Sequence, residues 1–281
     1  MTREAPSVLA QRCQKVAFTL VLALAAAGAG FLPAASHARG FGASITPPRF
    51  EIQVKAGQTQ RQVIEIQQSA GQAGSFRAYT NDWEFQPDGN LTFSNAIAAD
   101  SCRQRVAIER RKLTVAASGR YRFRFEITPP AGTPARECRF AVMVEGVDPT
   151  RVVNSGVSIP VGGRIAVIVY ASIEGAEPVL QFNTKSVATI KKQQMPTIEV
   201  RNTGNAHGRL TGFLNGTDAT GQSIELAPAD LPILPGEPRV IALTVVTDDP
   251  KGPSGINYPL AVKGTLEWGK NRFLLEHTFS R

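Results

Sequence analysis

From residue 45 to its end, the chain is made of short runs in which apolar and polar residues alternate. In the clearest run, 120–127 (RYRFRFEI), aromatic and aliphatic residues alternate with arginines and a glutamate. A period of two places successive side chains on opposite faces of a strand, so one face of this strand is expected to lie in a core. No convincing helical period is present after residue 38. The pattern therefore predicts an all-β protein.

The predicted strands fall into two groups separated by a linker-like stretch, 172–178 (SIEGAEP). Short strands with polar turns between them are typical of antiparallel sandwiches of the immunoglobulin type. We therefore predict two tandem immunoglobulin-like β-sandwich domains, residues 39–171 and 179–281. The strands expected in the first are 45–54 (interrupted by Pro47-Pro48), 62–67, 76–85, 91–93 (after a hairpin turn at 87–90), 106–115, 120–127, 138–144 and 157–170. Those expected in the second are 197–200, 209–215, 224–226, 240–246, 260–266 and 272–279.

The stretch 157–170 (VSIPVGGRIAVIVY) holds two apolar runs that a Gly-Gly step and Arg164 separate. The second run is apolar at nearly every position and is predicted to be buried on both faces. In the first run, Val157, Ile159 and Val161 alternate with a serine and a proline, so one side of it is expected to lack a partner within the chain. Such a strand is a liability unless another chain pairs with it. Adding a strand to a partner's sheet is also a recognised mode of binding.

The first 38 residues have the parts of a secretory signal peptide. Arg3, Arg12 and Lys15 precede an uncharged apolar segment, 16–31, and the sequence 36–38 (SHA) has small residues at the positions that define a cleavage site. The alternative is a transmembrane anchor, but the apolar segment is shorter than the ~20 residues that a spanning helix needs. We therefore expect cleavage after residue 38 and export, with no insertion into a membrane.

Removal of the signal peptide would lower the formal net charge from +8 to +6, because three basic residues and one acidic residue are lost. In an exported protein, this mild positive charge favours anionic protein ends or surfaces over nucleic acid as partners. Two cysteines would remain, Cys102 and Cys138. An even number of cysteines in an exported chain predicts a disulfide, and two buried free thiols are the alternative.

The sequence offers little for catalysis or metal binding. After cleavage the remaining histidines are His207 and His277, so a three-histidine metal site is excluded. A nucleophile elbow and a phosphate-binding glycine loop are also missing. The sequence 205–209 (NAHGR) is interpreted as a tight turn, and the arginines between 103 and 124 as a solvated sheet face rather than a nucleic-acid site. We expect a protein that is not an enzyme and that needs no cofactor or metal.

Two segments together resemble one family. The segment 44–52 (SITPPRFEI) has an arginine, Arg49, directly after a proline, and 157–170 has the alternating run that leads into a buried strand. With export and two sandwich-like halves, this resembles the PapD-like periplasmic chaperones of bacterial pilus assembly. The resemblance implies that Val157, Ile159 and Val161 are lent to an incomplete pilus subunit. It also implies that Arg49 and a lysine hold the subunit's terminal carboxylate in a cleft.

The chain departs from that family at several positions, as a divergent member would. The family's cleft lysine falls on Ala166, but Arg164 lies two residues earlier and thus on the same face of a regular strand. Arginine can bind a carboxylate through two parallel hydrogen bonds, so Arg164 can take the lysine's place. The family's Arg-Pro at the end of this strand is Tyr170-Ala171 here, and the cysteine pair is not a general family feature.

The resemblance therefore implies a periplasmic chaperone that caps pilus or fimbrial subunits by donating a β-strand and clamping the subunit's C-terminal carboxylate. Its expected partners are those subunits, with an outer-membrane usher as a further candidate. The alternative is an exported structural or adhesive β-sandwich protein without chaperone activity.

Overall fold

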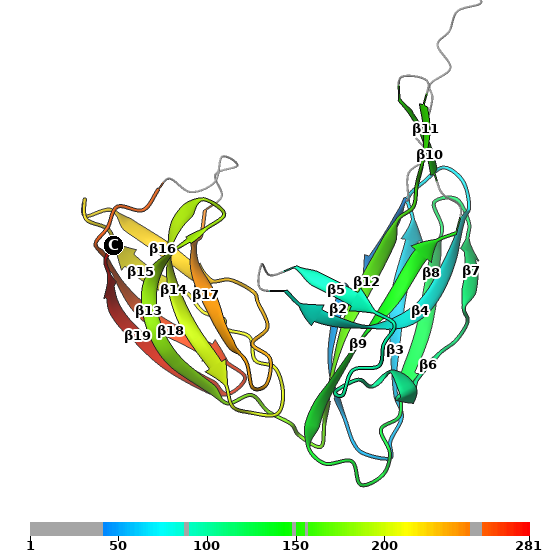
Figure 1. The fold of residues 1–281 in the computed structure, drawn as a ribbon, viewed down its shortest axis with the longest axis horizontal. Helices are drawn as coiled ribbons and strands as arrows, with labels where there is room; N and C mark the ends of the chain where they lie inside the picture. The colour runs from blue at the N-terminus through cyan, green and yellow to red at the C-terminus, as the bar shows by residue number, and fades with distance from the viewer. Residues whose placement is uncertain (1–41, 87–89, 148–149, 155–156, 248–254) are drawn as a thin grey trace, which may run out of the picture. The chain divides into compact units, whose positions relative to one another are not determined.

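The computed structural model describes residues 42–281, apart from 87–89, 148–149, 155–156 and 248–254. The predicted signal peptide and most of the turn predicted at 87–90 lie outside the described residues. The described residues form strands and loops, with one 3-10 turn, η2 (Arg103–Arg105), which confirms the predicted all-β class (Figure 1). Within these residues, no helix has the length and hydropathy of a membrane span.

The first half of the described chain is a sandwich of two sheets. Its core lies between them, where the inward-facing residues Phe123, Phe125 and Phe140 are at most 2% exposed. The alternation that predicted these strands is thus the alternation between core and solvent. One sheet has the order β1 (Ala43–Thr46), β3 (Gln60–Gln68), β8 (Arg120–Ile127) and β6 (Val106–Ile108), and the other has the order β2 (Arg49–Val54), β12 (Arg164–Ile173), β9 (Arg136–Gly146), β4 (Gly74–Phe85) and β5 (Leu91–Ser94), with β7 (Lys112–Val115) also paired to β4.

Two predicted strands are each divided between the two sheets. The predicted strand 45–54 is broken at Pro47-Pro48, so that β1 pairs with β3 and β2 pairs in parallel with β12. Proline lacks the N–H that a continuing ladder needs, which explains the break. The predicted strand 106–115 is also divided, because β6 pairs with β8 whereas β7 pairs with β4.

The second half is a seven-stranded antiparallel sheet that folds around its own apolar core, which includes Ile198, Leu226 and Leu275. The first and last strands of the sheet come together where the rings of Phe182 and Phe273 stack 4.0 Å apart. The strand order is β13 (Leu180–Ile190), β14 (Gln193–Asn202), β17 (Pro238–Val245), β16 (Ser223–Pro228), β15 (Leu214–Thr217), β18 (Leu260–Trp268) and β19 (Asn271–Phe279).

In this half, one strand was missed and one predicted strand was wrong. Strand β13 was not predicted, because its register shifts between Phe182 and Lys185 and the shift interrupts the alternation. The predicted strand 209–215 is mostly loop, since β15 begins at Leu214. Gly212 has a φ of +115°, which lies outside the strand region, and this backbone turn ends any regular strand there.

The segment of the chain that connects β9 to β12 forms a separate antiparallel ribbon. It consists of β10 (Thr150–Asn154) and β11 (Val157–Val161), with Val152 opposite Ile159. The two strands form a sheet of their own, and Figure 1 shows the ribbon extending beyond the sheet that contains β9 and β12. Among the described strands, β11 pairs with β10 alone, so its other edge is unpaired there.

Candidate functional site

The outer face of the sheet around β12 carries both arginines that the sequence singled out. Residues Val167 and Val169 point into the core, so the alternate positions, from Arg164 to Tyr170, point outward. In the parallel pairing of β2 with β12, Arg49 lies opposite Ile168. Arg49 and Arg164 therefore share one face of the sheet but are separated along β12 by four residues, or about 13 Å.

The middle of this face is apolar. Trp83, Met143 and Tyr170 are buried there, and Leu234 from the second half of the chain belongs to the same cluster. The rings of Trp83 and Tyr170 meet edge to face, 5.4 Å apart. Phe93 of β5 also packs against this cluster. Charged groups are thus concentrated at the two ends of the face, one around Arg164 and one around Arg49.

At the first end, Arg164 lies opposite Glu145 of β9 and 5.9 Å from the centre of the Phe93 ring. Glu145 accepts hydrogen bonds of 2.8 Å from Arg77 and from the Tyr79 hydroxyl. These two bonds and the nearby positive charges, including Arg164, lower the pKa of Glu145. The sequence showed no acidic neighbour of Arg164, but the fold brings one to it.

At the second end, Arg49 is joined by Arg209, which lies far from it in the sequence. The Oε1 atom of Glu51 forms an ion pair with Nε of Arg49 at 2.9 Å and accepts a hydrogen bond of 3.0 Å from Nε of Arg209. Asp230 contacts the same two guanidinium groups, with 3.2 Å to Arg49 and 2.7 Å to Arg209. Two carboxylates therefore bridge two arginines, and the structure brings Arg49 together with Arg209 rather than with Arg164.

His207 lies beside this group and is almost fully buried. Its ring stacks on Tyr170 with 3.8 Å between ring centres, its Nδ1 lies 2.5 Å from Glu137, and its Nε2 lies 3.5 Å from Glu51. Burial opposes protonation of the ring, but the hydrogen bonds to Glu137 and Glu51 outweigh it, so the pKa of His207 is raised. Burial also raises the pKa of Tyr170, to about 12.

The segment 205–209 therefore does more than the turn that the sequence predicted. The backbone carbonyl of Asn205 accepts a hydrogen bond of 2.8 Å from the Glu137 N–H, and the Asn205 side chain donates one to the carbonyl of Ala135. These bonds hold the loop against the start of β9, which places His207 and Arg209 beside Tyr170. The only signal in the sequence was a histidine and an arginine together in one short polar loop, and this does not reveal their partners.

A cavity of about 710 Å³ opens beside these residues. Arg49, Glu51, Arg209 and Asp230 line one part of it, and Trp268 and Lys270 line another. In this lining, the two arginines are paired with the two carboxylates.

The three apolar residues that the sequence assigned to client binding, Val157, Ile159 and Val161, all lie in β11. The backbone of this strand is described, and it presents one edge that no described strand pairs. Strand β11 thus has one edge that no described strand pairs, whereas β12, which follows it, is paired with β2 on one edge and with β9 on the other.

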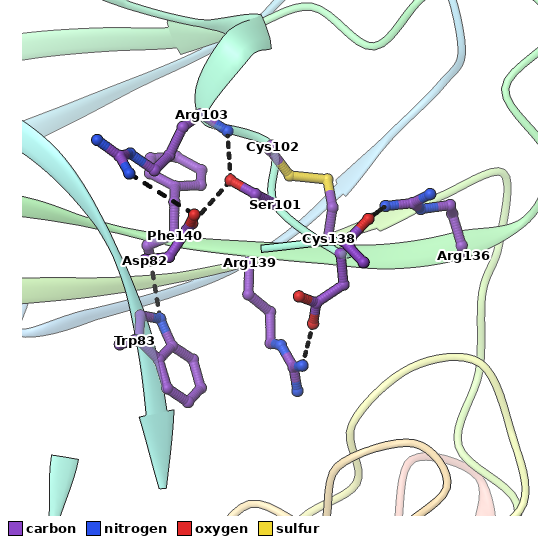
Figure 2. Close-up of a disulfide and its surroundings, with 11 residues drawn as sticks. Asp82, Trp83, Ser101, Cys102, Arg103, Arg136, Cys138, Arg139 and Phe140 are labelled. Carbon is purple, nitrogen blue, oxygen red and sulfur yellow. Dashed lines mark hydrogen bonds and ion pairs between the residues drawn. A yellow bond between two sulfur atoms is a disulfide. The ribbon is translucent and has the colours of Figure 1, made fainter. Parts of the chain in front are cut away.

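The predicted disulfide between Cys102 and Cys138 is confirmed, and both residues are buried (Figure 2). The disulfide joins Cys102, which directly precedes η2, to Cys138 of β9, which directly follows Glu137. Asp82 supports the same segment by accepting a hydrogen bond of 2.7 Å from Ser101. The disulfide therefore fixes the end of β9 that carries Glu137, the partner of His207.

No family model matches this sequence, and no curated protein matches it either. Solved structures do match, among them the E. coli chaperone DraB, with 12% identity, 85% of this chain and 98% of that chain covered, and a TM-score of 0.48. The Salmonella enterica SafA pilin in complex with the SafB chaperone matches with 10% identity, 86% and 99% coverage, and a TM-score of 0.48. The Acinetobacter baumannii CsuC–CsuE chaperone–tip adhesion subunit complex matches with 14% identity, 85% and 99% coverage, and a TM-score of 0.44. Chaperones are therefore among the solved proteins that this chain resembles over most of its length.

Proposed function

We propose that this chain is an exported chaperone that donates strand β11 to a pilus or fimbrial subunit lacking a strand of its own sheet. The observation that carries the proposal is the ribbon of β10 and β11. It stands outside both sheets of the first sandwich, and the second edge of β11 is unpaired among the described strands. A two-stranded ribbon is marginally stable in water, and a free edge is a template for another strand.

The sequence of β11 suits donation to an apolar groove. Val157, Ile159 and Val161 occupy alternate positions of the strand, so in a regular strand their side chains project to one face. Burying three such side chains in a partner contributes on the order of 5–8 kcal/mol before ordering costs. A slip of one residue would turn all three to the wrong face, so the register of the complex must be set.

We propose that the outer face of the sheet around β12 sets this register by binding the subunit's C-terminal carboxylate. Arg49 and Arg164, the two cations expected from the resemblance, lie on that face about 13 Å apart along β12, and Arg49 is the candidate cation. The proposed setting is the periplasm, after cleavage of the signal peptide, with an outer-membrane usher as a further candidate partner. The proposed role is binding rather than catalysis.

The proposal is tested by purifying the tagged chain from the periplasm of its own host and identifying co-purifying proteins by mass spectrometry. We expect a pilus subunit in a stable complex with the wild-type chain. Ile159→Asp should lose this partner, because it places a charge where an apolar side chain is buried. Ser158→Asp is the matched control, since the neighbouring position faces the other way and should retain the partner.

Equal recovery of the subunit with wild type and Ile159→Asp would exclude donation of β11. Recovery of no subunit from a host that assembles pili, with the chain folded and abundant, would favour an exported structural or adhesive protein.

A further inference from the structure

We propose that Asp230 occupies, in the free protein, a binding site for carboxylate groups that Arg49 and Arg209 form together. On this proposal, the terminal carboxylate of a client displaces the Asp230 side chain, and Arg209 supplies the second cation. The identity of the ligand as a chain terminus rests on the proposed chaperone function, but the carboxylate site itself does not.

The contacts of Asp230 are those expected of a bound carboxylate. Its Oδ1 lies 2.7 Å from Nη1 of Arg209, and its Oδ2 lies 3.2 Å from Nη1 of Arg49. The two oxygens of one carboxylate thus reach two guanidinium groups. Charge-assisted pairs of this kind are among the stronger hydrogen bonds in proteins and recognise the carboxylate group rather than the residue that carries it.

The two sides of this site differ in exposure. The Arg209 side chain is 13% exposed and the Asp230 side chain is 67% exposed. Arg209 is also held by Glu51 at 3.0 Å and by the Tyr170 hydroxyl at 3.3 Å. Asp230 lies in the loop between β16 and β17. The cation is therefore fixed, whereas the carboxylate lies on the solvent side and can rotate away without moving a strand.

The charge balance also favours an exchange. Arg49 and Arg209 face Glu51 and Asp230, so two cations meet two carboxylates. Replacing the Asp230 carboxylate by another carboxylate preserves this balance, whereas adding an anion without displacement would leave an excess negative charge. Removing the charge of Asp230 would leave the site one positive charge in excess, which should attract a carboxylate.

Arg164 is less suited to act with Arg49. It lies four residues before Ile168, the residue of β12 that is level with Arg49, and thus about 13 Å away along the strand. Its guanidinium group lies over Phe93 and near Glu145. Arg209, by contrast, already shares both of its carboxylate partners with Arg49.

The test uses the exported chain without residues 1–38 and a short acetylated peptide of alternating valine and threonine that ends in a free carboxylate. The same peptide with an amidated end is the ligand control, and binding is followed by calorimetry. Asp230→Asn should bind the free-acid peptide about three- to tenfold more tightly, because the internal competitor is gone. Arg209→Gln should weaken binding by about tenfold or more.

Arg122→Gln is the matched control for loss of one arginine, since Arg122 is exposed on the other sheet of the first sandwich. It should leave binding of the peptide unchanged. Arg164→Gln should weaken binding less than Arg209→Gln does. Thermal unfolding of each variant separates a lost contact from a lost fold, and Asp230→Asn, which is expected to gain affinity, cannot be explained by misfolding.

The proposal is overturned if Asp230→Asn leaves affinity unchanged, or if Arg164→Gln weakens binding as much as Arg209→Gln. Equal binding of the acid and amide peptides, with acetate bound in an Arg209-dependent way, would overturn the chain terminus as the ligand. If the peptide behaves as expected while Ile159→Asp still captures a subunit, strand donation fails and the carboxylate site remains. If Ile159→Asp loses the subunit but Arg209→Gln does not affect binding of the peptide, the carboxylate site fails and strand donation remains.

Discussion

Strands β11 and β12 follow one another in the chain and share an alternation of valine and isoleucine, but their surroundings differ. Strand β12 is paired on one edge with β2 and on the other with β9, and Val167 and Val169 are fully buried in the core. Strand β11 is paired with β10 alone among the described strands. The comparison shows that an alternating pattern specifies which residues can be buried together, whereas neighbouring strands decide what buries them.

The change from one environment to the other takes place at Gly162-Gly163. The carbonyl of Gly163 still accepts a hydrogen bond of 3.0 Å from the N–H of Gly146, the last residue of β9. A side chain on Gly162 would meet no atom within 4 Å. The ladder between β9 and β12 thus ends here, and the ribbon begins in open space.

The largest effect is expected from Val169→Asp in β12. It places a carboxylate in a core position that is 0% exposed, so we expect a loss of at least about 4 kcal/mol of unfolding free energy, or failure to fold. Ile159→Asp in β11 should change stability by no more than about 1 kcal/mol, because the ribbon lies outside both sheets. Urea unfolding of the two variants measures the difference. Similar losses in both would show that β11 is part of the core and would remove the basis for donation.

Removal of the disulfide should have the second-largest effect. Replacing both Cys102 and Cys138 by alanine should cost about 2–4 kcal/mol, because the bond closes a loop between residues separated by 36 positions. The loss should appear in thermal unfolding of the sandwich, and a subunit should still be captured by β11. Labelling of the denatured, unreduced wild type should find both cysteines blocked. Two reactive thiols per chain would contradict the predicted bond.

A smaller effect is expected from His207→Gln, since glutamine keeps a donor for Glu137 but not the charge. We expect a loss of about 1–2 kcal/mol near pH 6. The raised pKa of His207 means that its charge stabilises the fold fully below its unfolded pKa, and that this contribution is lost as pH rises through the folded pKa. Wild type should therefore lose stability as pH rises above about 6.5, the ordinary pKa of histidine, and the variant should lose less. Parallel pH profiles would show that His207 is neutral in the folded protein.

The smallest effect on stability is expected from Arg49→Ala. Arg49 is an exposed strand-end residue whose ion pairs with Glu51 and Asp230 are partly solvated, so its loss should cost about 0–1 kcal/mol of unfolding free energy. Capture of a subunit should nevertheless weaken by roughly 2–5 kcal/mol, because a buried carboxylate would lose a cation. Unfolding and binding measured on the same preparation separate the two. A large loss of stability would make Arg49 a structural residue instead.

Much of the first sandwich follows from the sequence, because alternation is a property of consecutive residues. The run 120–127 predicts both the strand β8 and its buried face, and the two cysteines that would remain after the predicted cleavage predict their own bond. The interruption of the first predicted strand at Pro47-Pro48 could also be predicted, because prolines lack the N–H groups that a ladder needs. Which sheet each piece joins could not, since that choice depends on partners distant in sequence.

The candidate site divides in the same way. The sequence by itself determined the strand character of 157–170, the apolar series Val157, Ile159 and Val161, and an arginine after a proline at Arg49. Only the tertiary structure decided that Arg209, 158 residues from Glu51, would share that carboxylate with Arg49. The physical reason is that backbone periodicity arises between adjacent residues, whereas this ion-pair network arises where strand β2 meets loops that are distant in sequence.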